Sequence, residues 1–181
     1  MEPDYYCDFD FDGDEFYLDF VGLDPGISGA TKFVFGSDSG LWKEDAGEAM
    51  YEFRSANYSF EVEGPVGGFS DDGLELTIVD SDVPELVFEG SVVARQFELR
   101  ESEFGLIQNN ATISSGENRD PAIFIIENSN VDRFVNNGFI GDQNRQAIYL
   151  TNYYAEDPYD ADDGIRVFEN YGYIFSQDYN A

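Results

Sequence analysis

AIFIIENSNVDRFVNNGFIG, residues 122–141, is the stretch of sequence that decides the fold. It contains an apolar run, a small polar turn at Ser129, a second apolar pair and a closing Gly141. Bursts with the same internal order start at Met50, Leu74, Phe97, Ala122 and Ala147, which lie 24, 23, 25 and 25 residues apart. A period this even predicts a stack of similar units, each of which buries its apolar side against its neighbours.

The bursts alternate apolar and polar residues in the manner of a β-strand. In one of them Leu74, Leu76 and Ile78 fall on the same side of an extended chain. The polar turns carry serines, at Ser55, Ser81, Ser102 and Ser129. Glycines close the second arm, at Gly64, Gly90, Gly116 and Gly141. We therefore expect two or three short strands in each repeat.

The pattern, most clearly in AIFIIENSNVDRFVNNGFIG followed by AIYLTN, resembles right-handed parallel β-helix proteins. The resemblance implies an all-β fold: a right-handed parallel β-helix of about five rungs over residues 50–181, preceded by an N-terminal arm and cap over residues 1–49. A single jelly-roll β-sandwich is the alternative, since its antiparallel strands and turns would also be evenly spaced. Little helix is expected in either fold, and the best helical candidate is the segment 41–53.

The chain is strongly acidic, yet it is apolar enough to form a core. Its 181 residues include 38 Asp and Glu against nine Lys and Arg, which gives a formal net charge of -29, and 42% of the residues are hydrophobic. Only Lys32 and Lys43 are lysines. This composition resembles that of proteins from haloarchaea and their viruses. Molar salt makes such a composition tolerable, because it shortens the Debye length to roughly 3 Å and screens the self-repulsion of the chain.

The composition also argues against several classes of function. Nucleic-acid binding requires clustered Lys and Arg, and a membrane helix requires an apolar run of about 18 residues, so we expect neither nucleic-acid nor membrane partners. The chain has no histidine, which removes Ser-His-Asp and Cys-His catalysis and the usual zinc sites. Cys7 is the only cysteine, so no internal disulfide can form. We expect no catalytic residues.

The opening run CDFDFDGDEFYLDF, residues 7–20, contains one candidate metal site. The spacing of a calcium-binding loop is shared by Asp8, Asp10, Asp12, Asp14 and Asp19. Two features depart from the EF-hand pattern: the last position is an aspartate instead of the bidentate glutamate, and the preceding segment has no helical period. The alternative is a strand that buries its phenylalanines and leaves its aspartates hydrated. Calcium is the only cofactor that these residues suggest.

A second acidic cluster occurs in EDPYDADDGIRVF, residues 156–168. It brings four carboxylates near Arg166 in sequence: Asp157, Asp160, Asp162 and Asp163. β-Helical polysaccharide-active enzymes use aspartates with a basic partner, but the histidine and lysine that accompany them are missing here. We interpret the cluster as a solvated loop between two strands.

Together these features predict a non-enzymatic structural protein of a halophilic virus particle, acting at the capsid surface, in a turret or near the tail. The protein would be located in the virion, which is assembled in a high-salt host cytoplasm. Its partners would be other virion proteins and further copies of itself, with which it would form a homotrimer. A β-helical polysaccharide-active enzyme and a glycan- or calcium-binding module are the alternative functions. The link from fold to function is an analogy.

The acidic composition generates a prediction about salt. We expect the melting temperature of the chain to rise markedly between low salt and molar KCl, because molar salt screens the repulsion among its carboxylates. Circular dichroism melts across a KCl series measure this. A melting temperature that stays flat from low to molar salt would contradict a halophilic adaptation.

Overall fold

The computed structural model describes residues 6–12, 15–21, 32–36, 48–65, 73–115, 122–142, 146–151 and 164–176. These residues form sixteen β-strands and contain no helix. The predicted all-β class is therefore confirmed. Of the segment 41–53, which the sequence suggested as the best helical candidate, residues 48–53 lie in a strand, β4 (Glu48–Arg54), and residues 41–47 lie outside the described residues.

The strands form two large sheets. The first has the order β1 (Tyr6–Asp12), β2 (Glu15–Val21), β4, β6 (Gly73–Val79), β8 (Ser91–Arg100), β10 (Thr112–Ser115), β13 (Phe139–Asp142) and β16 (Tyr173–Ser176), and also contains β11 (Ala122–Glu127) and β14 (Gln146–Thr151). The second has the order β3 (Lys32–Gly36), β5 (Ser59–Glu63), β7 (Asp82–Glu89), β9 (Glu103–Asn109), β12 (Asn130–Asn136) and β15 (Gly164–Asn170).

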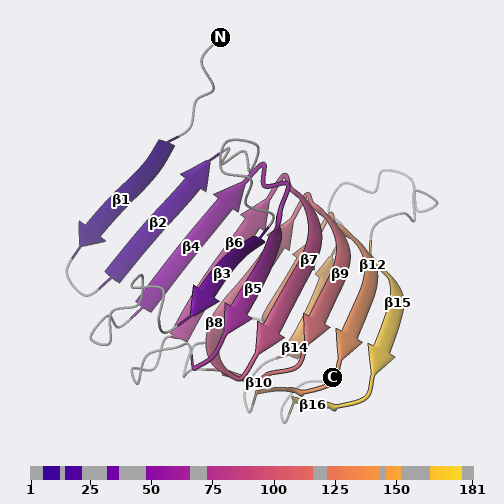
Figure 1. Cartoon of the computed structure of the whole chain (residues 1–181). Helices are drawn as coiled ribbons and strands as arrows, with labels where there is room; N and C mark the ends of the chain where they lie inside the picture. Colours follow the sequence, from indigo (N-terminus) through magenta and orange to yellow (C-terminus); the bar gives the residue numbers. More distant parts are fainter. Residues whose placement is uncertain are drawn as a thin grey trace.

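From β2 to β9 the chain alternates between the sheets, so that each strand lies beside the strand two elements later in sequence. After β9 it makes two short strands in the first sheet, such as β10 and β11, before it returns to the second. Figure 1 shows the consequence: the order of the strands along the molecule follows the order of the sequence, from β1 at one end to β15 at the other. Every described pair is parallel except β1 with β2.

The register bears on the antiparallel alternative considered from the sequence. Phe97 of β8 lies opposite Phe124 of β11, and Phe124 lies opposite Ile148 of β14, with all three strands parallel. An antiparallel jelly roll is therefore wrong for the described strands. Ile148 packs against the core, whereas its neighbour Tyr149 is exposed.

The core lies between the two sheets and is dominated by phenylalanine. One column of rings runs through several repeats, with centroid distances of 4.8 Å from Phe88 to Phe97, 4.9 Å from Phe97 to Phe124, 5.7 Å from Phe124 to Phe134 and 5.3 Å from Phe134 to Phe168. The first four rings of this column are fully buried. Contacts of this kind add about 0.5–1.5 kcal/mol each to the free energy of burial.

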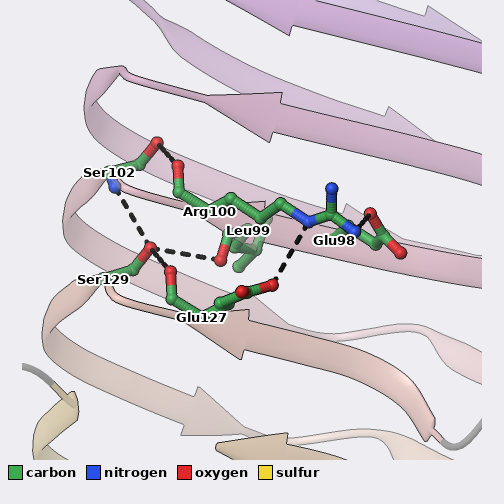
Figure 2. Close-up of polar contacts among 6 residues, drawn as sticks. All are labelled: Glu98, Leu99, Arg100, Ser102, Glu127 and Ser129. Carbon is green, nitrogen blue, oxygen red and sulfur yellow. Dashed lines mark hydrogen bonds and ion pairs between the residues drawn. The ribbon is translucent and has the colours of Figure 1, made fainter. Parts of the chain in front are cut away.

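Serines hold the corner at which the chain passes from the first sheet to the second. Ser81, Ser102 and Ser129 are buried there, and each hydroxyl accepts a hydrogen bond from the backbone N–H of the equivalent residue one repeat earlier, at 3.0–3.1 Å. Each hydroxyl also lies within 2.6–2.8 Å of the carbonyl two residues before it, to which it donates (Figure 2). The serine column thus connects successive repeats and satisfies buried backbone groups that would otherwise have no hydrogen-bond partner.

Each corner serine follows a residue in the left-handed backbone region, at Asp80, Glu101 and Asn128, with φ between 46° and 49°. The equivalent of these residues in the earlier repeat is Ser55, with φ of 55°, and the equivalent of Ser81 is Ala56. The alignment of Ser55 with the other serines in the sequence was therefore wrong by one residue.

The spacing of the repeats also differs from the even period of the sequence bursts. Equivalent corner residues lie 25, 21 and 27 residues apart, from Ala56 through Ser129. The second corner contains Gly64, Gly90, Ala111 and Gly138 in equivalent positions. Gly141 instead lies in strand β13, where it pairs with Ser114 of β10, and Gly116 lies outside the described residues. The loops therefore vary in length while the corners keep their register.

The predicted boundary between residues 1–49 and residues 50–181 stays a prediction. Strands from before residue 50 pair in parallel with strands from after it, as β2 does with β4 and β3 with β5. The two sheets are therefore continuous across that point of the chain.

The aromatic column generates a prediction about stability. Replacing Phe124 with Ala should lower the free energy of unfolding by about 3–5 kcal/mol, because it leaves a cavity among the rings of Phe88, Phe97 and Phe134. Phe168→Ala is the matched control, since its ring ends the same column and is 45% exposed. Denaturant unfolding in molar KCl measures both. Equal losses in the two variants would contradict a core that is closed around Phe124.

Candidate assembly surface

The outer face of the first sheet carries rows of ion pairs. Arg100 bridges Glu98 on its own strand and Glu127 on the next, at 2.5 Å and 3.4 Å (Figure 2). Arg95 lies beside Glu75 in the same way, at 3.3 Å. Pairs of this kind contribute about 0–1 kcal/mol when they are solvent-exposed. They give the side of the molecule a hydrated, mixed-charge surface and add little to its stability.

The C-terminal end of the stack has a different character. Strands β15 and β16 end their sheets, and β14 pairs only with β11. No described strand lies against the outer edges of these three strands. The open edge of a sheet presents backbone N–H and C=O groups that can pair with another chain.

Exposed apolar side chains are concentrated at this end. Seven of the eight exposed large hydrophobic residues among those described lie between residues 149 and 175, namely Tyr149, Leu150, Val167, Phe168, Tyr171, Tyr173 and Phe175. Tyr173 is 77% exposed and Leu150 is 50% exposed. We call β14, β15 and β16 with Tyr171 the C-terminal face. A concentration of exposed apolar side chains on three neighbouring strands is typical of an interaction site.

The C-terminal face is also neutral. Its three strands contain only two charged residues, Arg166 and Glu169. Arg166 pairs with Asp132 at 3.0 Å, and Glu169 pairs with Arg133 at 2.5 Å. The face therefore carries no net charge within a chain whose formal net charge is -29. At the other end of the first sheet, β1 contains Asp8, Asp10 and Asp12.

A ladder of asparagine side chains leads to the C-terminal face. The Asn109 amide donates to the side-chain oxygen of Asn136 at 2.8 Å, and the Asn136 amide donates to that of Asn170 at 2.8 Å. Asn109 and Asn136 are fully buried, and the Asn109 oxygen accepts the N–H of Ala111 at 2.9 Å. Asn170 is exposed at the end of the stack, and no described residue continues the ladder beyond it.

Two buried tyrosines have raised pKa values. Burial raises the pKa of Tyr51 and Tyr58 to about 12, because desolvation disfavours the phenolate. Both belong to the hydrophobic core, and Tyr58 packs on Phe60 with centroids 5.1 Å apart. Their raised pKa values therefore report packing and do not mark a chemical site.

The aspartates of the predicted calcium loop lie on two paired strands. Asp8, Asp10 and Asp12 are in β1 and Asp19 is in β2, with Asp8 opposite Asp19 in the antiparallel register. Asp14 lies outside the described residues. Calcium binding by these residues stays a prediction. Elsewhere, the part of the chain whose side chains are described contains no cluster of three or more His, Cys, Asp or Glu that could hold a metal ion.

The second acidic cluster divides in a similar way. Its four aspartates, between residues 157 and 163, lie outside the described residues, and Arg166 lies in β15. The described partner of Arg166 is Asp132 of the neighbouring strand, which no sequence argument had connected to it.

Comparison with known proteins places the chain in no group. No protein-family model, curated protein or solved structure matches it. Within the described residues no helix could cross a bilayer.

The sequence reasoning missed both the asparagine ladder and the C-terminal face. The ladder has a visible signal, since IQNNATI, FVNNGFI and FENYGYI begin at Ile107, Phe134 and Phe168 and share an apolar residue at each end and the ladder Asn at the third position. The face has one too, because its last three strands are almost free of charge. Both signals are hidden by the separation of 34 residues between Asn136 and Asn170, which departs from the expected period.

The ladder generates a matched pair of substitutions. Asn136→Ala should lower the free energy of unfolding by about 1–3 kcal/mol, because it removes the partner of the buried Asn109 amide. Asn170→Ala should cost clearly less, because water reaches that end of the ladder. Chemical denaturation of both variants in molar KCl measures the difference. Equal costs would show that the ladder does not depend on burial.

Proposed function

We propose that the chain is a structural protein of a halophilic virus particle and that it acts by assembly and display. The observation that carries this proposal is the division of its surface into hydrated, ion-paired flanks and one neutral, apolar end. Such a division suits a rigid body that attaches by one face and exposes the rest. In the assembled particle the apolar end is buried and the flanks face the solvent.

We also propose that the body of the protein is a right-handed parallel β-helix. The support is the parallel pairing from β2 to β16, the regular return of the chain between two sheets and the corner residues that recur in register. Connections between parallel strands of one sheet are right-handed in about 98% of cases, which supports the handedness.

The interior polar groups support a structural role. The buried serines and asparagines hydrogen bond to their equivalents in the next repeat or to nearby backbone. A satisfied network of this kind makes a core rigid and specifies one register. Rigidity along the stack is the property that a displayed particle component needs.

The carboxylate-rich flanks suit a protein that works in high salt. The pairs of Arg100 with Glu98 and Glu127 lie at the protein surface and contribute little energy, and the carboxylates that are so abundant in the chain serve hydration and solubility. Molar salt screens their mutual repulsion. A particle component made in a salt-rich cytoplasm would have this surface.

The proposal is tested on virus particles isolated from a culture of cells in which the gene for this chain is present. Particles are banded on a density gradient in molar salt and probed with antibodies against the purified chain. We expect the chain to band with the particles in many copies per genome, and gold-labelled antibodies to mark intact particles. An abundant host cytoplasmic protein is the control and should not enter the band. A chain found only in the soluble cell fraction would overturn the proposal.

A further inference from the structure

The C-terminal face combines three properties. It has open strand edges, it contains nearly all the exposed large apolar side chains, and its two charges are paired internally. We propose that this face binds the same face of a second copy, so that two chains form an end-to-end dimer with two-fold symmetry. The inference rests on the proposed assembly function and names the partner at that surface.

Charge identifies the occupant. Two copies, each with a formal net charge of -29, repel one another wherever carboxylates meet. The three strands of the C-terminal face carry no net charge, so pairing these strands with the same strands of a second copy places no like charges of the strands together. A basic partner would call for an acidic face, which this is not. Contacts through the flanks would place glutamates such as Glu98 and Glu127 of neighbouring copies close together.

The acidic edge of the first sheet opposes a head-to-tail arrangement. At the opposite end of the molecule that sheet ends in β1, with Asp8, Asp10 and Asp12, while the second sheet ends in β3, whose one charged residue, Lys32, pairs with Glu61. Burying these carboxylates against an apolar face would cost their hydration without supplying a cationic partner. A head-to-tail contact also propagates into an open filament unless it closes into a ring, whereas two identical faces close after one contact.

The geometry of β15 suits two-fold pairing. An axis perpendicular to its sheet places β15 antiparallel to the same strand of the second copy, which pairs the open backbone edges. Val167 and Phe168 then lie beside the same residues of the second copy. Phe168 ends the buried aromatic column, so the dimer extends the column from one chain into the other.

The test measures mass by sedimentation equilibrium in molar KCl over a concentration series. We expect the wild-type chain to reach twice its 20.4 kDa. Val167→Glu should weaken self-association by roughly tenfold or more, since two like charges then meet at the axis, and about 1.4 kcal/mol corresponds to each factor of ten. Val34→Glu is the matched control and should dimerise like the wild type, because Val34 is 41% exposed but lies in β3 at the other end.

Charge complementation separates a lost contact from a misfolded chain. Val167→Arg alone should also be monomeric, whereas an equimolar mixture of Val167→Glu and Val167→Arg should form a heterodimer. Melting curves test whether each variant is folded. If a variant is unfolded, Leu150→Glu on β14 is used in its place. Failure of the mixture to associate, a wild-type monomer or trimer, or dissociation by Val34→Glu would each overturn the inference.

The outcome is independent of the particle experiment. A monomeric chain that bands with particles would overturn the dimer and leave the structural function standing. A two-fold dimer absent from particles would do the reverse. A wild-type monomer whose C-terminal face resists labelling would identify another segment of the same chain as the occupant and would overturn the dimer.

Discussion

Register is the constraint on which the structure depends, and the buried polar groups at the corners set it. A chain that turns between two packed sheets must bury polar side chains and backbone groups at each turn, and each of them needs a partner. The Ser102 hydroxyl satisfies the Ser81 N–H, and the Ser129 hydroxyl satisfies the Ser102 N–H. A slip of one residue would orphan these groups and turn the apolar rows outward. Parallel pairing, the aromatic column and the asparagine ladder follow from that register.

The sequence predicts the strands better than it predicts their alignment. Alternation over Leu74, Leu76 and Ile78 correctly predicts one buried side, because burial of apolar area dominates strand formation. The parallel stacking of β11 and β14 also follows from repetition. Alignment fails where it relies on a constant period, since the separation of equivalent residues ranges from 21 to 34. Loop closure depends only weakly on loop length, so the corners impose no fixed period on the chain between them.

The candidate site was not predictable in the same way. Strand edges and exposed side chains depend on where the stack ends, and nothing in the local pattern of YIFS distinguishes an exposed strand from a buried one. The aromatic density of the tail was visible, but it predicts interior packing as readily as an interface. Only the structure separates Phe134, which is fully buried, from its exposed equivalent Phe168.

The two ends of the stack solve the edge problem in different ways. At the N-terminal end β1 folds back antiparallel on β2, and its aspartates would oppose pairing with another chain. Edge strands of soluble proteins use such charges to prevent aggregation. At the C-terminal end the chain keeps parallel edges, apolar side chains and no net charge. A chain that can place carboxylates almost anywhere, and has 38 of them, leaves them out of these three strands. Because an unprotected edge is a liability in a monomer, its retention together with so many exposed apolar side chains is consistent with a face that is covered in the assembled state.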